Sequence, residues 1–146
     1  MTKMVDVSDK IVQKRKAVAE GRLKLRQDTV KKIRAGEVRK GDVLTVSQIA
    51  GIQAAKDTAD IIPLCHQVPL SSVDVQFEFG KDTVTARTTV ITNNVTGVEM
   101  EALVGTTAAL LSVWDMVKYL EKDKNGQYPV TAILDVRVLE KSKEAL

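Results

Sequence analysis

Two strand-like stretches joined by a tight turn lie between two long helical stretches, and this order restricts the possible folds more than any other feature. Apolar and polar residues alternate through 73–79, and Gly-Lys-Asp at 80–82 is typical of a hairpin turn. The alternation continues on the return stretch, 84–90. Because successive side chains of a strand point to opposite faces, we expect a hairpin with one face on a core and the other in water.

The helical stretches on either side of this hairpin carry recognisable end signals. Asp42 precedes an apolar segment, 43–60, and its side chain is suited to capping a helix there. The second stretch opens with Thr96 and Glu99 in the spacing of a capping box. We expect this second helix to run to about Lys122, ahead of an Asn-Gly stop signal.

The first of these helices is apolar nearly all round, with Val46 and Ile49 among its apolar residues. A helix that packs on one sheet needs only one apolar stripe. We therefore expect this helix to be covered on two sides and to form part of a subunit interface. The small residues around Gly51 would allow the close approach of a second subunit.

The remaining segments complete the order of elements. Alternation within 14–25 predicts a first strand, a short helix is expected from Asp28 to a stop at Gly36, and a last strand is expected over 130–139. The even-numbered apolar residues of the last strand should share one face. The resulting order, β-(α)-α-β-β-α-β, predicts an α+β fold: a ferredoxin-like split βαβ plan, with an antiparallel sheet and two long helices on one face.

The composition is that of a folded protein, with 44% hydrophobic and 28% charged residues. Cys65 is the only cysteine, so it cannot form an internal disulfide. Together with the lack of a signal-like segment near Met1, this predicts a cytoplasmic protein. No apolar run is expected to span a membrane.

Lysine and arginine crowd the first forty residues, although the net charge is only +3. Such a region attracts nucleic acid or a phosphorylated small molecule, or it is simply a solvated face. An RNA-binding module of this fold would stack bases on aromatic side chains exposed on its sheet. Phe77 and Phe79 instead share the apolar face of their strand, so we expect no nucleic-acid partner.

The only histidine, His66, adjoins Cys65 on the connection between the first long helix and the hairpin. Connections of this kind often carry functional side chains on a rigid scaffold, although a lone pair of this type is also compatible with simple packing. One cysteine and one histidine are too few for the usual zinc or iron patterns. We therefore expect no metal site.

On the second long helix, Asp115 and Lys118 are three residues apart and therefore neighbours on its surface. Such a pair is either an exposed ion pair of little energetic value or, where partly buried, a proton-transfer pair. Glu101 lies fourteen residues before Asp115, which is about 21 Å at 1.5 Å per residue. The two carboxylates cannot both contact one small substrate within one subunit.

The split βαβ plan groups these candidates at two ends, because its two long helices run antiparallel. Cys65 and His66 should lie near Glu101, at the start of the second helix. Lys40, at the start of the first helix, should lie near Asp115. Each subunit would then present two half-sites, and we expect a composite site in which a second subunit supplies the other half.

Six short blocks follow one another in order along the chain. They are Met4-Val5-Asp6-Val7-Ser8, Lys40-Gly41-Asp42-Val43, Ile49-Ala50-Gly51-Ile52-Gln53-Ala54-Ala55-Lys56, Ile62-Pro63-Leu64-Cys65-His66, Thr96-Gly97-Val98-Glu99-Met100-Glu101-Ala102-Leu103 and Asp115-Met116-x-Lys118. Together they resemble the cyclic pyranopterin monophosphate synthase (MoaC) family, over nearly the whole chain. Any one block alone would be a weak signal, whereas six in order are specific.

The resemblance implies a lyase of molybdenum cofactor biosynthesis. It would convert (8S)-3′,8-cyclo-7,8-dihydroguanosine 5′-triphosphate to cyclic pyranopterin monophosphate with release of diphosphate. It also implies a homohexamer, built as a trimer of dimers, with sites at subunit interfaces. We expect residues 1–11 to be a flexible arm and 12–146 a single ferredoxin-like catalytic domain. No cofactor is expected to be required, although Mg²⁺ can accompany the triphosphate.

The resemblance also assigns roles by position. Asp115 matches the family's catalytic acid/base residue, and Lys118 and Lys40 match its companion lysines. The positions that match substrate-binding residues are Leu64, Cys65, His66, Met100, Glu101, Glu99, Lys56 and Lys141. Several cations suit a triphosphate and its leaving diphosphate. The Cys65 thiol is expected to pack rather than to attack, and a non-catalytic scaffold or ligand sensor is the alternative to an enzyme.

Overall fold

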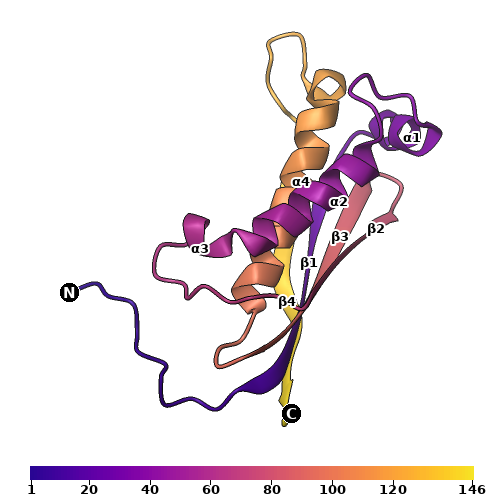
Figure 1. Ribbon diagram of the computed structural model, residues 1–146. Helices are drawn as coiled ribbons and strands as arrows, with labels where there is room; N and C mark the ends of the chain where they lie inside the picture. The colour runs from indigo at the N-terminus through magenta and orange to yellow at the C-terminus, as the bar shows by residue number, and fades with distance from the viewer.

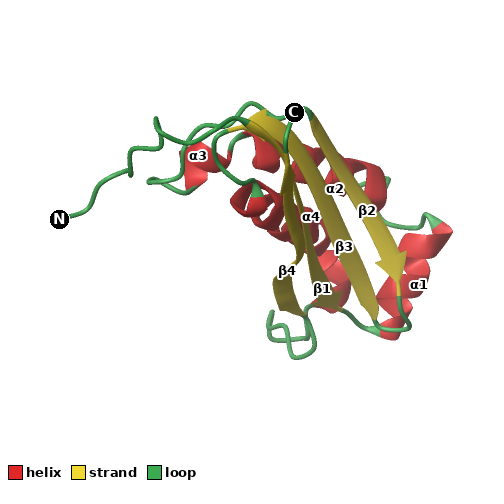
Figure 2. Ribbon diagram, turned by 90° about the horizontal axis from the view of Figure 1, so that it is seen from below, coloured by secondary structure: helices red, strands yellow, loops and turns green.

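The computed structural model describes residues 1–146, and it has one antiparallel sheet with the helices α2 and α4 packed on one face (Figures 1 and 2). In chain order the elements are β1 (Gln13–Lys24), α1 (Gln27–Ala35), α2 (Val43–Lys56), α3 (Thr58–Ile61), β2 (Ser72–Phe79), β3 (Thr83–Asn94), α4 (Glu99–Glu121) and β4 (Ala132–Glu144). The strand order is β2-β3-β1-β4, with every neighbouring pair antiparallel. This confirms the expected α+β, ferredoxin-like arrangement.

The core lies between the sheet and the two long helices. On β2, Val75 is buried, and Phe77 and Phe79 pack against the same core. The inner face of β3 is fully buried, as the alternation predicts, at Val84, Ala86, Thr88 and Val90. Because Phe77 and Phe79 are the only aromatic residues in the strands, the outer face of the sheet offers no aromatic platform for stacking bases.

Helices α2 and α4 cross in close backbone contact. A Cβ atom added at Gly51 would lie 3.0 Å from the carbonyl oxygen of Gly105, and one added at Gly105 would lie 3.1 Å from that of Gly51. Only glycine permits so close an approach. Gly51 therefore serves packing within the chain, not the approach of a second subunit, whereas Val46 and Ile49 on the same helix are exposed.

The first long helix is shorter than the predicted segment, 43–60. Helix α2 ends at Lys56, and the backbone turns at Asp57 before the short α3. The hydroxyl of Thr58 donates a hydrogen bond to the carbonyl oxygen of Ala55 at 2.9 Å. Such a local bond competes with the continuation of a helix.

The capping box predicted for Thr96 at the start of α4 does not form. The N-cap is Val98, which has no side-chain capping bond. Glu99 instead accepts a hydrogen bond from Nζ of Lys141 on β4, at 3.2 Å. Because the helix begins at Glu99, Thr96 lies too far ahead of it to cap it. Asp42 behaves as predicted, because its carboxylate accepts a backbone N–H of the first turn of α2.

Contrary to the expectation that no apolar run would span a membrane, helix α4 is, by length and composition alone, long and apolar enough to do so. Half of its apolar window is buried inside the protein. Its buried residues, among them Leu110, Val113 and Val117, belong to the main hydrophobic core. Helix α4 is therefore the central core helix of the fold.

Strand β4 is longer than expected, and its alternation is interrupted. It spans Ala132–Glu144 rather than 130–139, and two bulges shift its pairing with β1. At the first bulge Asp135 adopts a φ of 56°, in the left-handed region. The single face predicted for the even-numbered residues is wrong, because pairing with β1 places Leu134 and Val138 on opposite faces.

The second bulge, at Leu139, decides which way the end of β4 faces. Beyond it Lys141 pairs with Ala17. Lys143 pairs with Arg15. Ala17 and Arg15 both belong to the buried face of β1, and paired residues point to the same side of a sheet. The bulge thereby turns the two lysines toward the helix layer.

Candidate active site

Lys40, Asp115 and Lys118 meet near the C-terminal end of α4 and are called the lysine–aspartate cluster below. Nζ of Lys40 donates to Oδ2 of Asp115 at 2.8 Å and to its backbone carbonyl at 3.2 Å. Nζ of Lys118 lies 3.1 Å from Oδ1. Lys40 reaches Asp115 from the turn between α1 and α2, where Gly41 has a φ of 110°.

The two lysines determine the charge of this cluster. The hydrogen bond from Lys40, followed by that from Lys118, holds the pKa of Asp115 below its ordinary value. The carboxylate is therefore ionised at neutral pH and can accept a proton, while the two ammonium groups can donate one. All three side chains are about half exposed, so a ligand can reach them. As ion pairs alone they would add little to stability.

At the other end of α4, Glu101 is buried, with 3% of its surface exposed. Its Oε2 accepts from the thiol of Cys65 at 3.9 Å, and its Oε1 has no hydrogen-bond partner. Burial raises the pKa of Glu101. Burial and the neighbouring carboxylate raise the pKa of the Cys65 thiol, which is therefore protonated at neutral pH and a poor nucleophile.

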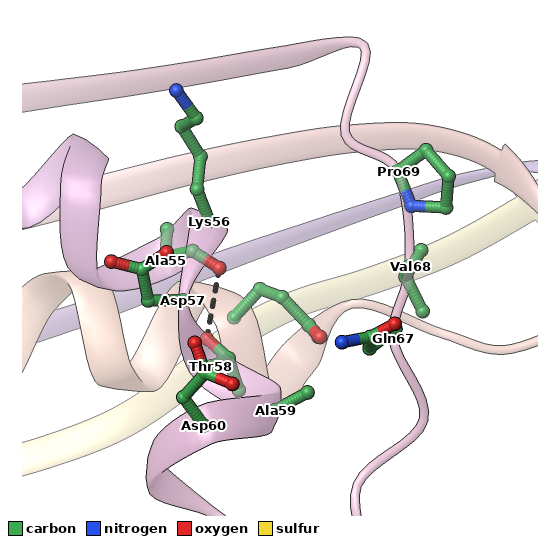
Figure 3. Close-up of a pocket in the computed structure, with 10 residues that line it drawn as sticks. Ala55, Lys56, Asp57, Thr58, Ala59, Asp60, Gln67, Val68 and Pro69 are labelled. Atoms are coloured by element: carbon green, nitrogen blue, oxygen red, sulfur yellow. Dashed lines mark hydrogen bonds between the residues drawn. The ribbon is translucent and has the colours of Figure 1, made fainter.

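Glu101 lines a cavity of about 300 Å³ between the end of α2, α3 and the loop that precedes β2 (Figure 3). Lys56 and Gln67 also line this cavity. In Figure 3 the side-chain amide of Gln67 points from its loop toward α3, whereas the amine of Lys56 points away from the other labelled side chains. Asp57 and Asp60 line it as well, so the walls offer several carboxylates and an amide, which suits a ligand with hydrogen-bond donors.

His66 lies beside the same loop and contacts the N-terminal arm, since its Nε2 is 2.6 Å from the carbonyl oxygen of Val5. Figure 1 shows the arm extending from the start of β1 toward the loop that follows α3. Leu64 and Met100, two further residues predicted to bind substrate, are both exposed at this end of the protein. The end of the protein at which α4 begins therefore carries Glu101 together with other residues predicted to bind substrate.

A basic pocket of about 240 Å³ lies at the same end, and its charged lining consists of Arg15, Lys16, Lys141 and Lys143. Arg15 is only 8% exposed. Its guanidinium donates to the carbonyl oxygen of Asn94 at 3.1 Å and to the side-chain oxygen of Gln13 at 3.4 Å, with no carboxylate partner. A buried cation that lacks an anionic partner, next to further cations, suits a phosphate group.

Of these pocket residues, sequence reasoning found only Lys141. One signal for Arg15 was present: it stands in the buried phase of its strand, two residues before Ala17 and four before Ala19. An arginine in a core phase is unusual and indicates a partner or a ligand. Lys143 could not have been found in this way, because its direction depends on the bulge at Leu139.

The predicted residues therefore form two groups. The structure brings Lys40 to Asp115 and Cys65 to Glu101, as the antiparallel helices implied. It does not bring these two groups together, because Asp115 and Glu101 lie near opposite ends of α4. No group of three or more His, Cys, Asp or Glu side chains is placed to hold a metal ion.

The sequence profile that defines the MoaC family matches residues 4–144 of this chain. The chain belongs to the MoaC family. Curated relatives from Pyrococcus abyssi and Thermococcus kodakarensis are 57% and 55% identical over 97% of this chain, and over 89% and 90% of their own length. Both are named probable cyclic pyranopterin monophosphate synthase. A relative from Methanothermobacter thermautotrophicus, 54% identical over 97% of this chain and 89% of its own, is named a probable accessory protein of that synthase.

Membership of the MoaC family confirms the resemblance that the six ordered blocks carry. The match also spans Arg15 and Lys143, so the whole basic pocket lies within the family's extent.

Proposed function

We propose that this protein is the lyase that converts (8S)-3′,8-cyclo-7,8-dihydroguanosine 5′-triphosphate to cyclic pyranopterin monophosphate, with release of diphosphate, in molybdenum cofactor biosynthesis. The observation that carries the proposal is Asp115 held between Lys40 and Lys118 in a member of the MoaC family. The names of its relatives supply the product, and the geometry supplies the chemical groups that such a reaction needs.

The reaction requires proton transfer at more than one stage. Forming the cyclic phosphate joins a hydroxyl oxygen to the α-phosphorus and breaks the bond between that phosphorus and the departing diphosphate. The hydroxyl must lose a proton, and rearrangement of the purine-derived ring moves others. We assign these transfers to the lysine–aspartate cluster, where the ionised Asp115 accepts protons and the neighbouring ammonium groups donate them.

The basic pocket would bind the triphosphate. Four cations line one cavity, of which Lys16 and Lys141 also pair with carboxylates and Arg15 and Lys143 do not. The same charges would stabilise diphosphate as it leaves, because charge-assisted hydrogen bonds are stronger than neutral ones. Glu101 lines a separate cavity at the same end of the molecule. Its unpartnered oxygen would accept hydrogen bonds from the purine-derived ring of the substrate.

The complete site would be assembled from two subunits. Asp115 and Glu101 are about 21 Å apart along one helix. A second copy must therefore bring its lysine–aspartate cluster to the first copy's basic pocket. Exposed apolar residues, Val46 and Ile49 on α2 and Leu111 on α4, supply a surface for such a contact. We propose a homohexamer, built as a trimer of dimers, acting in the cytoplasm without nucleic acid, membrane or an essential metal.

The first test is turnover of freshly prepared cyclic dihydro-GTP, with diphosphate and pyranopterin measured by mass spectrometry. The wild type should form both products. Asp115→Asn should lose about 10²- to 10⁴-fold in kcat, the range of general acid–base catalysis. Asp74→Asn, on the exposed edge strand, is the control and should retain activity. No product from an intact wild-type oligomer would favour the scaffold alternative.

The second test addresses the composite site. His66→Ala and Asp115→Asn proteins should each be inactive, and mixed oligomers of the two should regain activity. Recovery is expected because some interfaces in the mixture unite an intact His66 half with an intact Asp115 half. Mixed oligomers that stay inactive would contradict a site shared between subunits.

A further inference from the structure

Tyr119 connects the turn that carries Lys40 to the helix that carries Asp115. Its hydroxyl oxygen accepts a hydrogen bond from the backbone N–H of Arg39 at 3.0 Å. The guanidinium carbon of Arg39 lies 4.5 Å from the centre of the Tyr119 ring, in a cation–π contact. Tyr119 therefore holds the residue before Lys40 by both its backbone and its side chain.

The position of Tyr119 on α4 suits this role. It follows Lys118 directly and comes four residues after Asp115, about one helical turn. Its ring packs against the main hydrophobic core while its hydroxyl reaches the surface. The side chain that holds the turn is thus fixed by the same helix that presents the carboxylate.

The turn is also held by Val38, which is buried in the main core two residues before Lys40. Its backbone hydrogen bonds run to its own residues, to the end of α1 and to the first turn of α2, for example from Gly41 N to Val38 O. The bond from Arg39 to Tyr119 is the one that joins the backbone of the turn to α4. Because a lysine side chain has four carbons and many rotamers, its ammonium stays at a defined place only where its backbone is held.

We propose that Tyr119 is a positioning residue for Lys40, fixing the place of the Lys40 ammonium against Asp115. The proposal rests on the proposed function, in which the lysine–aspartate cluster transfers protons. A shift of about 1 Å in a reacting group can cost a hundredfold in rate. Tyr119 does not touch the substrate or take part in the chemistry, and acts only through Lys40.

Two variants separate the contributions of the ring and the hydroxyl. Tyr119→Phe keeps the packing and the stacking on Arg39 but removes the acceptor, and should lower kcat about tenfold with little change in KM. Tyr119→Leu removes both contacts and should lower kcat further. Tyr128→Phe is the matched control: this ring packs edge-on against Trp114 at 5.3 Å, and its hydroxyl makes no hydrogen bond to the protein. It should leave kcat unchanged.

A second measurement does not depend on activity. The carboxyl ¹³C signal of Asp115, followed by NMR against pH, reports its titration directly. The charged groups that face Asp115 are Lys40 and Lys118, and the Lys40 hydrogen bond is the largest cause of its lowered pKa. Tyr119→Phe should raise the pKa of Asp115 part of the way to its value in Lys40→Met, whereas Tyr128→Phe should not move it.

The two measurements distinguish failure of this inference from failure of the proposed function. The inference is overturned if the pKa of Asp115 is unchanged in both Tyr119 variants, provided that thermal unfolding measurements show both variants to be folded. A shifted titration with unchanged kcat in an active enzyme overturns it as well. A shifted titration in a protein whose wild type forms no product overturns the proposed function, and leaves the connection between Tyr119 and Lys40 standing.

Discussion

The thiol of Cys65 donates to Oε2 of the buried Glu101 across 3.9 Å, while Oε1 of the same carboxylate has no partner. One weak donor stabilises a buried carboxylate poorly, which is why burial raises its pKa. Glu101 is therefore kept in an unfavourable setting that a ligand with N–H groups would relieve. Such a ligand would complete the hydrogen bonds that the protein leaves open.

Glu101 should make stability depend on pH. Because its pKa in the folded protein is raised above the ordinary 4.5, the folded state holds this proton more tightly than the unfolded state. The free energy of unfolding should therefore fall as pH rises above about 4.5. Glu101→Gln should remove this loss of stability. The variant should therefore be more stable relative to the wild type at about pH 8 than at about pH 4. Urea unfolding at both pH values measures the free energy of unfolding of the two proteins. An equal difference between variant and wild type at both pH values would contradict the prediction.

Truncation of Glu121 should destabilise the fold. This fully buried carboxylate accepts from the hydroxyl of Thr29 at 2.5 Å, the hydroxyl of Thr131 at 2.7 Å and the backbone N–H of Arg26 at 3.1 Å. Glu121→Ala leaves these donors unsatisfied and should cost about 3 kcal/mol in the free energy of unfolding. The exposed Glu144→Ala should cost less than about 0.5 kcal/mol. Similar losses in the two variants would argue against the buried network.

Arg15 should contribute to substrate binding through the basic pocket. Arg15→Gln should raise KM at least about tenfold, since a hydrogen bond to a charged group contributes about 1.5–3 kcal/mol. The matched control is Lys14→Gln, because Lys14 is the next residue on β1, is exposed and pairs with Glu144 at 3.8 Å. Steady-state kinetics at two salt concentrations would measure the difference. An equal effect of both substitutions would mean that only the general charge matters.

Alanine at Gly51 should destabilise the helix crossing. An exposed helical glycine usually gains about 1 kcal/mol on replacement by alanine. Here the new methyl group would meet Gly105 O at 3.0 Å and Val75 at 3.1 Å, so we expect a loss of about 1–3 kcal/mol instead. Chemical denaturation decides the sign, and a gain in stability would show that the two helices can separate without cost.

The parts of the fold that sequence predicted well are those with one buried and one wet face. More buried and more exposed residues alternate along β2 and β3, so the period of two and the turn between them are compatible only with a hairpin. The proximity of Lys40 to Asp115 followed from the direction of two helices and is confirmed. These predictions needed only local periodicity and one topological rule.

The predictions that failed depended on contacts made by distant segments. The capping motif predicted at Thr96 does not form, because α4 begins only at Glu99, and the carboxylate of Glu99 accepts from Lys141, far along the chain. The basic pocket was missed because it combines β1 with β4, and the direction of the β4 side chains follows from bulges rather than from alternation. No single-segment pattern contains that information.

The bulge at Leu139 determines the sign of the charge in the basic pocket, because it decides which residues of β4 face inward. If β4 kept its first bulge but continued past Leu139 without the second, Glu140 and Glu144 would face inward and Lys141 outward, and carboxylates would replace lysines in the pocket. Deletion of Leu139 removes a residue that pairs with nothing and should leave KM intact, whereas deletion of Ser142 should not. Chain length can therefore vary by one residue at the bulge without loss of the pocket, whereas a deletion between Lys141 and Lys143 would turn Lys143 to the other face.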